Sequence, residues 1–329
     1  MLHYLKKILQ ETRVFREKPV YLSAQKYQVT FSVQLKNSIS ESQKVTLVMP
    51  LPAETAYQKI EALGLKPEGY NKKSEKKAGN RYAFWESTIE PQQTLDYEIA
   101  CTAQVLPRVM TLRPEWTMQD YTAIKNTPDY YLYLSSNHYL DGVDPRIKKL
   151  SSEIVGSARG LAEIVSLLND AVIKKLTYGN PILGLYSFGE ALEKEKMDCG
   201  GFDALLGSLL KAEGIPARII SGFWTDSQPN TATQKMHAWL EILLPNNTWF
   251  PLDPSIEQLR KNGRTKKFGG VGNIGSDRLV FSVGEDFMVT TGNENLPLAI
   301  LQNPVIIPEK GLDSITLKTD IVTESNTSQ

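Results

Sequence analysis

Cys199 is the residue of this chain whose type and setting most readily suggest chemistry. It lies in the stretch Met-Asp-Cys-Gly-Gly-Phe, directly before an apolar run that predicts a helix. A helix N-terminus carries partial positive charge and free N–H groups, and both favour the nucleophilic thiolate. Asp198 opposes this effect, because a neighbouring carboxylate disfavours a second negative charge. The alternative is a small buried cysteine in a helix that packs on a sheet.

Asp198 also predicts the start of this helix, since an aspartate at the N-cap accepts hydrogen bonds from free backbone N–H groups. We expect the helix to begin at about Cys199 and to end at Gly214. Gly200 and Gly201 weaken a helix, and we expect them to allow a substrate backbone to approach the sulfur closely.

A thiolate nucleophile needs a nearby base, which is usually a histidine held by a third group. The chain has three histidines, His3, His138 and His237, and only His237 lies in a predicted strand beside other polar residues. Alternation along His-Ala-Trp-Leu-Glu puts His237, Trp239 and Glu241 on one strand face, opposite an apolar face. We therefore expect His237 to face a cleft or solvent, with Trp239 as cleft wall and shield.

Asp253 is the candidate partner of His237. If the turn after this strand comprises residues 244–246, paired positions sum to 490 and His237 lies opposite Asp253. Opposite side chains in an antiparallel pair are about 5 Å apart, so the carboxylate can accept the Nδ1–H of His237. The alternative for Asp253 is a turn residue before Pro254. Because His and Asp coincide across one hairpin, we favour Asp253 as the partner of His237.

Residues 1–107 are predicted to contain an all-β, sandwich-like domain. The stretch 26–35 alternates polar and apolar residues, and further short alternating stretches follow between turn signals. Cys101 falls on the buried face of one of them, where an inert thiol is expected. Residues 108–143 are rich in Tyr and Pro, and we expect a linker that packs on the next domain.

The rest of the chain predicts helices followed by strands, which makes the fold class α+β. Asp144 before Pro145 is typical of a helix start. We place a catalytic domain at residues 144–310 and a polar, frayed C-terminal tail at 311–329.

Composition argues against several classes of protein, namely nucleic-acid binders, disulfide-rich proteins and metalloproteins. Lys plus Arg number 37, as do Asp plus Glu, so no net charge draws the chain to nucleic acid or anionic membrane. Two cysteines argue against a disulfide framework, and no spacing of metal ligands is present, so we predict no metal or other cofactor. No convincing signal peptide or membrane-spanning stretch is visible. These features predict a cytoplasmic location without a membrane span, and they leave the oligomeric state open.

Four segments together resemble the core of the transglutaminase-like superfamily: D-C-G-G-F-D-A-L-L, E-G-I-P-A-R-I-I-S-G-F, M-H-A-W-L-E and W-F-P-L-D-P-S. The resemblance covers about residues 140–290, and the β-rich segment before it is similar to the domain that precedes this core in bacterial and archaeal cysteine-peptidase-type members. It implies a papain-like fold, with a nucleophile helix packed on an antiparallel sheet. It also implies Cys199 as nucleophile, His237 as general acid and base, and Asp253 as its orienter. The oxyanion hole would use the N–H of Cys199 and, as a candidate, Tyr178, for which core packing is the alternative.

Such a triad forms a thioester with an amide carbonyl. Water as the second substrate gives a cysteine protease or amidase, and an amine gives a transglutaminase. We predict hydrolysis of a protein or peptide substrate, because water is always present and no amine pocket can be recognised. A protein-glutamine transglutaminase and a non-catalytic binding or scaffold protein are the alternatives. No calcium-loop spacing is present, and the polar segment 225–235 is either a mobile lid or a passive loop.

Overall fold

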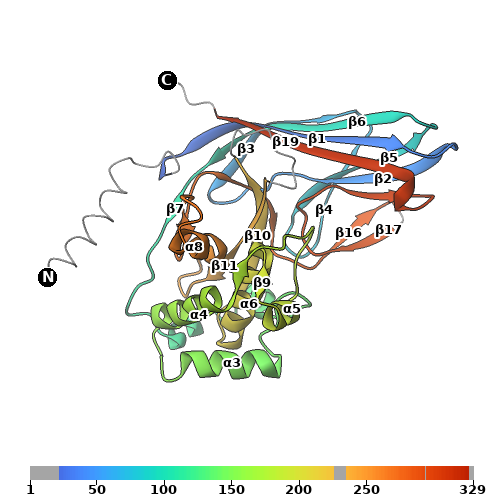
Figure 1. The fold of residues 1–329 in the computed structure, drawn as a ribbon. Coiled ribbons are helices and arrows are strands. Elements are labelled where there is room, and N and C mark those ends of the chain that lie inside the picture. Colours follow the sequence, from blue (N-terminus) through green and yellow to red (C-terminus); the bar gives the residue numbers. More distant parts are fainter. Residues whose placement is uncertain (1–21, 226–234, 293, 326–329) are drawn as a thin grey trace.

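The computed structural model describes residues 22–225, 235–292 and 294–325 of the 329-residue chain. Its fold is α+β, as the sequence predicts: an elongated, strand-rich part holds both ends of the described chain, and a helical part lies against it (Figure 1). Most of the segment 225–235, the predicted lid or loop, falls outside these ranges, as does the start of the chain. No helix in the described ranges is long and apolar enough to cross a membrane. The cytoplasmic location stays a prediction.

The strand-rich part is a sandwich of two four-stranded antiparallel sheets, with strand orders β19-β1-β6-β3 and β18-β2-β5-β4. Apolar residues of both inner faces form its core. The strands are β1 (Gln25–Asn37), β2 (Gln43–Pro50), β3 (Gln58–Lys66), β4 (Asn71–Ser74), β5 (Arg81–Ile89), β6 (Thr94–Val105), β18 (Val305–Pro308) and β19 (Ile315–Ser325).

The C-terminal part of the chain completes this sandwich. β19 pairs with β1 from Tyr27–Ser325 to Asn37–Ile315, and β18 pairs with β2. The polar tail predicted at 311–329 is therefore wrong for β19, and β18 lies with the sandwich although the sequence placed it in the catalytic domain. One face of β19 is exposed and polar, and this made the segment resemble a tail in the sequence. Ile315 and Ile321, on the other face, are buried in the sandwich core.

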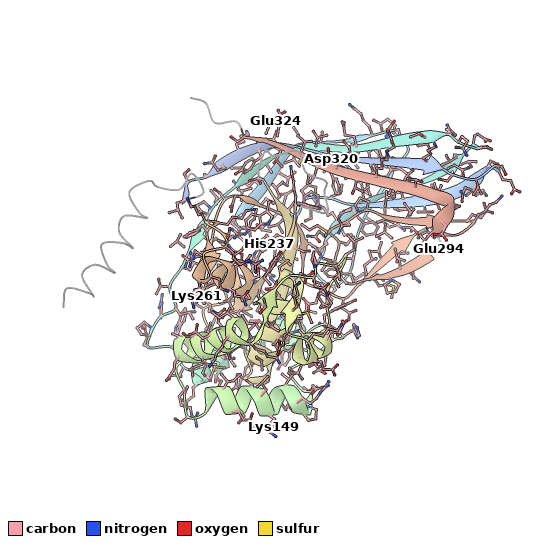
Figure 2. The ribbon with its side chains drawn as sticks, viewed as in Figure 1. Lys149, His237, Lys261, Glu294, Asp320 and Glu324 are labelled. Carbon is pink, nitrogen blue, oxygen red and sulfur yellow. The ribbon has the colours of Figure 1, made fainter. Side chains whose placement is uncertain are left out.

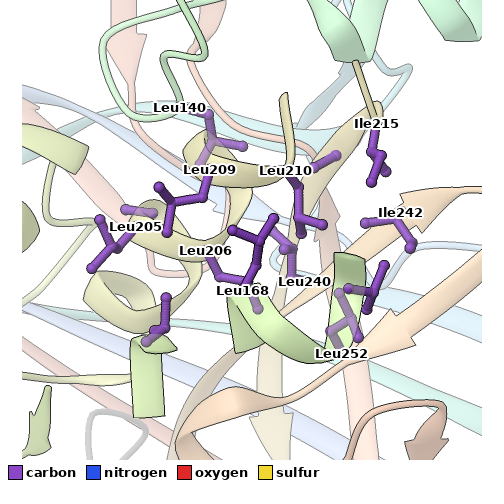
Figure 3. Close-up of a cluster of buried hydrophobic side chains, with 14 of the residues drawn as sticks. Leu140, Leu168, Leu205, Leu206, Leu209, Leu210, Ile215, Leu240, Ile242 and Leu252 are labelled. Carbon is purple, nitrogen blue, oxygen red and sulfur yellow. The ribbon is translucent and has the colours of Figure 1, made fainter. Parts of the chain in front are cut away.

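The second part is built on a sheet with strand order β12-β11-β10-β15, in which all pairs are antiparallel. Helix α6 (Cys199–Ala212) packs on one face, where its leucines meet Leu240 and Ile242 (Figure 3). Helices α3 (Pro145–Val155) and α4 (Leu161–Lys175) pack on α6. The strands are β10 (Ala217–Trp224), β11 (Met236–Leu243), β12 (Trp249–Leu252) and β15 (Arg278–Val283).

The sandwich packs against parts of both faces of this sheet: Phe223 pairs with Met236 and so shares the face of Ala238 and Leu240, whereas Trp239 lies on the opposite face. Phe31 of β1 makes edge-on ring contacts with Phe223 and Phe281, at centroid distances of 5.4 and 5.7 Å. Trp239 packs with Ala53, which follows β2. The sheet is therefore covered on both faces, and the strand face that carries His237 is buried rather than open to solvent.

Shorter elements connect these layers. Asp144 caps α3, as the sequence predicts, and Ser187 with Glu190 forms a capping box on α5. These elements are β7 (Arg108–Val109), η2 (Met118–Ala123), α2 (Pro128–Leu134), β8 (Thr177–Tyr178), α5 (Phe188–Glu193), β9 (Lys196–Met197), α8 (Pro254–Lys261), β13 (Gly269–Gly270), β14 (Asn273–Ile274), β16 (Phe287–Thr291), β17 (Glu294–Leu298) and η3 (Leu312–Ser314).

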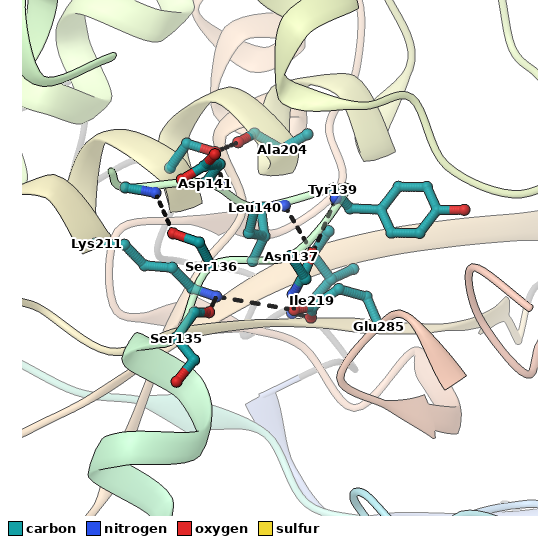
Figure 4. A network of polar contacts seen from close by, with 12 residues as sticks. Ser135, Ser136, Asn137, Tyr139, Leu140, Asp141, Ala204, Lys211, Ile219 and Glu285 are labelled. Carbon is teal, nitrogen blue, oxygen red and sulfur yellow. Dashed lines mark hydrogen bonds and ion pairs between the residues drawn. The ribbon is translucent and has the colours of Figure 1, made fainter. Parts of the chain in front are cut away.

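A buried polar network fixes the C-terminal end of α6 (Figure 4). Lys211 Nζ donates to the Ser135 carbonyl at 2.9 Å and lies 3.9 Å from Glu285 Oε1. Glu285 also accepts hydrogen bonds from Asn137 Nδ2 and from the Ile219 amide of β10. Burial lowers the pKa of Lys211 to about 8. The network links the C-terminal end of α6 to β10 through Glu285.

Candidate active site

Cys199 is the first residue of α6, as predicted, and it is partly exposed. Asp198 is the N-cap: its Oδ1 accepts the Gly201 N–H at 3.1 Å, and its Oδ2 accepts the Ile182 N–H at 3.0 Å. This carboxylate thus starts the helix and ties the preceding loop to it. Cys101, in contrast, is buried in the sandwich, where burial raises its pKa to about 11.

Neighbouring side chains pack closely against the two glycines after Cys199. A Cβ at Gly201 would lie 2.8 Å from Met197 Cβ, and one at Gly200 would lie 2.9 Å from Leu185 Cδ2. Such distances are too short for carbon atoms. We expected these glycines to admit a substrate backbone. In the structure Gly201 makes room for Met197, whereas Gly200 lies beside Leu185 and also lines the cavity next to Cys199.

His237 and Asp253 are hydrogen-bonded, with Nε2 2.9 Å from Asp253 Oδ2. Figure 2 places His237 in the interior, far from labelled surface residues such as Lys149 and Glu324. The bond uses Nε2 rather than the Nδ1 atom that we expected. Because an ionised carboxylate only accepts, the proton lies on Nε2, and Nδ1 is left to act as a base.

The hairpin register differs from the predicted one, yet the two residues still meet. Leu240 pairs with Leu252, so paired positions sum to 492 and the connection comprises residues 244–248. A shift of two positions keeps each side chain on its face, whereas a shift of one would have reversed it. Asp253 therefore stays on the face of His237, at a diagonal position that is still within reach.

Asp253 has two roles at once. Its Oδ1 accepts the Ile256 N–H at 3.1 Å and caps α8, so the alternative interpretation as a turn residue before Pro254 also holds. Its Oδ2 also accepts from Arg278 Nη2 at 2.9 Å. Burial alone would raise the pKa of Asp253, but His237 and then Arg278 outweigh it and lower the pKa to about 2. Arg278 was missed from the sequence, because it begins an apolar strand and nothing marks its partner.

Two tryptophans flank the imidazole. The Trp224 ring stacks on His237 with centroids 4.4 Å apart, and Trp239 lies at 5.9 Å, also stacked. Trp239 is fully buried, so it shields His237 without forming the cleft wall that we expected. Stacking on both sides restricts the imidazole to rotation in its own plane, where Asp253 holds it.

Cys199, His237 and Tyr178 line one cavity of about 300 Å³. The strand that carries His237 also places the Ala238 N–H toward the Cys199 sulfur. Of the sequence-predicted site residues, Cys199, His237 and Tyr178 therefore share one cavity, whereas Asp253 does not line it and contacts it through His237.

The electrostatics of this cavity favour neutral groups in the free protein. Burial raises the pKa of Cys199 well above its ordinary value, and the carboxyl groups of Asp198 and Asp203 act in the same direction. Burial lowers the pKa of His237, although Asp253 opposes the change. The Cys199 sulfur, followed by burial, raises the pKa of Tyr178, so its hydroxyl stays a donor. The expected helix-terminal stabilisation of the thiolate is thus outweighed by the surroundings.

Gln302 is a second residue that sequence reasoning missed. It is buried, it lines the cavity, and its Nε2 donates to the Gly222 carbonyl at 2.6 Å and to the His237 carbonyl at 3.2 Å. Gln302 thus links β10 and β11 by hydrogen bonds beside the imidazole. No sequence signal marks it, because it lies in an irregular segment far along the chain. Among the described residues, no cluster of His, Cys, Asp or Glu could hold a metal ion.

Part of the chain is similar to a known protein family. The chain matches the model of the Transglutaminase-like superfamily over residues 148–254, a range that contains Cys199, His237 and Asp253. The fold is similar to that of a candidate cysteine protease from Cytophaga hutchinsonii, with a TM-score of 0.62 and 14% identity over 93% of this chain and 92% of that one.

Two further similarities are weaker. The periplasmic domain of TgpA from Pseudomonas aeruginosa aligns with a TM-score of 0.37 and 13% identity over 77% of this chain and 93% of that one. YebA, an uncharacterized protein of Bacillus subtilis (strain 168), is 22% identical over 209 residues, which is 53% of this chain and 28% of that protein. The chain thus spans little more than a quarter of that relative's length. The part of the chain that carries α6 and β11 is thus similar to the Transglutaminase-like superfamily, whose model it matches over residues 148–254.

Proposed function

We propose that this protein is a thiol-dependent enzyme that hydrolyses amide bonds of a protein or peptide through Cys199, His237 and Asp253. One observation carries the proposal. Cys199 and His237 line the same cavity, and Asp253 holds Nε2 of the imidazole at 2.9 Å, which leaves Nδ1 for proton transfer. An oriented histidine beside a thiol is the arrangement that nucleophilic catalysis requires.

The proposed mechanism starts from the neutral pair. Cys199 Sγ attacks the amide carbonyl carbon while His237 Nδ1 takes the thiol proton. The C–N bond then breaks, the leaving amine takes that proton, and a thioester remains. Water attacks the thioester, His237 accepts its proton and returns it to the sulfur, and the carboxylic acid leaves. The Cys199 N–H and the Tyr178 hydroxyl would stabilise the negative oxygen, since Tyr178 is protonated and faces the same cavity.

Capture of the acyl-enzyme tests this proposal. The protein is mixed with p-nitrophenyl acetate, and the released nitrophenolate and the acetyl adduct are followed by absorbance and peptide mass mapping. We expect a burst of nitrophenolate with the adduct on Cys199, loss of both in Cys199→Ala and His237→Ala, and no change in Cys101→Ala. Absence of an adduct on Cys199 in the wild type would exclude the enzyme and favour the non-catalytic scaffold.

The acceptor is tested on the same intermediate. Dansylcadaverine added with an excess of water-soluble peptide substrate competes with water for the thioester. Hydrolysed product alone supports the protease or amidase, whereas preferential incorporation of the dansyl amine would instead identify a transglutaminase.

A further inference from the structure

The cavity beside Cys199 has apolar walls that come from distant parts of the chain. One wall is the loop between β8 and α5, and the other comes from β11 and from the segment before β18. The apolar residues that line it are Pro181, Ile182, Leu183, Leu185, Met236 and Ile300.

Charged groups in this cavity are few and already engaged. Among the described residues that line it, the ionisable groups are Tyr178, Asp198, Cys199 and His237. Both carboxylate oxygens of Asp198 accept backbone N–H groups, from Gly201 and Ile182. A charged substrate side chain would therefore lose its hydration in this cavity without gaining a free counter-ion, which is unfavourable.

The size of the cavity fits one bulky apolar side chain. It encloses about 300 Å³, whereas about 150 Å³ suffices to bind benzene in an apolar protein cavity. A leucine or phenylalanine side chain therefore fits, with room for the adjoining backbone.

Each wall is held in place by contacts with the rest of the fold. Ile300 and Leu185 are buried against the core that includes α6. Gln302 anchors the second wall through its bonds to the carbonyls of Gly222 and His237. Asp198 anchors the first through the Ile182 N–H. A preformed pocket selects its occupant by shape and polarity.

We propose that this cavity is the acyl-side specificity pocket of the enzyme, so that its substrate carries a bulky apolar residue, such as leucine or phenylalanine, within two residues of the attacked carbonyl on the acyl side. The inference rests on the proposed function of Cys199, and it adds the substrate class.

Peptidyl chloromethyl ketones test the pocket without requiring turnover. Dipeptidyl reagents in which either residue is Leu, Phe, Ala, Asp or Lys are compared by their second-order rate of alkylation at Cys199, with iodoacetamide as the reference. We expect reagents with Leu or Phe at one of the two positions to react at least ten-fold faster than those with Asp or Lys there, since pocket fit alone discriminates by about that factor.

Leu183→Asp and Leu312→Asp form a matched pair of variants. The two leucines are equally exposed, at 68% and 67%, so neither substitution should disturb folding, but only Leu183 lines the cavity. Leu183→Asp should shift the preference from Leu toward Lys reagents by about ten-fold, and Leu312→Asp should leave it unchanged.

Equal rates for all reagents, no gain over iodoacetamide, or the same shift in both variants would each overturn the pocket assignment. These results are distinguishable from failure of the proposed function, which is the absence of an acetyl adduct on Cys199.

Discussion

At the scale of single residues, Asp253 orients the candidate base and neutralises Arg278 at the same time. Asp253→Asn keeps the shape but removes the charge, so we expect kcat/KM for a peptide substrate to fall about 10²- to 10⁴-fold. Asp277→Asn is the matched control, because Asp277 pairs with Arg278 at 2.9 Å without contacting His237. An equal loss in Asp277→Asn would mean that the charge of Arg278, rather than the orientation of His237, limits the reaction.

Asp203 lies one helical turn after Cys199, fully buried, and neither carboxyl oxygen has a hydrogen-bond partner among the described residues. Burial, then the carboxylates of Asp253 and Asp198, raise its pKa well above the ordinary value. In the unfolded chain the pKa of this group is about 3.9. Below that pH, Asp203 is neutral in both states and does not lower the free energy of unfolding. As the pH rises toward the pKa of the folded state, ionisation favours the unfolded chain and the protein loses stability.

Asp203→Asn removes this dependence, because an amide does not ionise. We expect the difference in free energy of unfolding, variant minus wild type, to increase by about 1–3 kcal/mol between pH 3.5 and pH 8. Urea unfolding at several pH values measures the difference, and Asp320→Asn, at an exposed position of β19, is the control. A parallel pH dependence of wild type and Asp203→Asn would show that Asp203 is ionised in the folded protein.

At the scale of elements, the start of α6 is constrained by the residue before it. Gly201→Ala would place a Cβ 2.8 Å from Met197 Cβ. Overpacking of this kind costs about 1–3 kcal/mol, which exceeds the gain of about 1 kcal/mol in helix propensity. We expect a lower midpoint in urea unfolding, whereas Gly189→Ala in α5, whose added Cβ would lie 3.9 Å from Ser187 Oγ, should raise it slightly. A stabilised Gly201→Ala variant would contradict the packing described for this turn.

β19 offers a second test at this scale, because neighbouring residues face opposite environments. Ile321 is fully buried in the sandwich, and Val322 is 45% exposed. Ile321→Ala should lower the free energy of unfolding by about 2–5 kcal/mol, and Val322→Ala should change it by about 0.5 kcal/mol or less. Equal, small effects in the two variants would support the polar tail that the sequence suggested.

At the scale of the molecule, Glu241 joins the two parts of the chain. It accepts hydrogen bonds from Tyr57, before β3, and from Arg218 of β10, and it pairs with Arg108 of β7. Burial alone would raise the pKa of Glu241, but Arg108 and then Arg218 outweigh it and lower the pKa to about 2. The stability that this carboxylate contributes is present above its ordinary pKa and is lost as pH falls toward 2.

Glu241→Gln leaves two buried guanidinium groups without a counter-ion. We expect the free energy of unfolding at pH 7 to fall by about 3–5 kcal/mol, as measured by urea unfolding. Glu61→Gln removes an exposed ion pair with Lys26 and should leave the midpoint nearly unchanged. If both variants unfold at the same midpoint, Glu241 does not hold the two parts together.

The sequence predicted those features that depend on local pattern. The alternation of β1, the cap at Asp198 and the strand face of His237 follow from residue types a few positions apart. The hydrogen bond of His237 to Asp253 was reached through a wrong register, because a two-residue shift conserves the face. Arg278, Gln302 and the pairing of β19 with β1 could not be foreseen, since each depends on contacts between segments far apart in the chain.

The pairing of β19 with β1 has a consequence for synthesis on the ribosome. About 210 residues separate the end of β6 from the start of β19, and at 5–20 residues per second they take about 10–40 s to emerge. Throughout that interval the outer edge of β1 has no partner strand, and an unpaired edge invites pairing with other chains. Until its last strand arrives, the nascent chain is therefore open to intermolecular pairing along that edge.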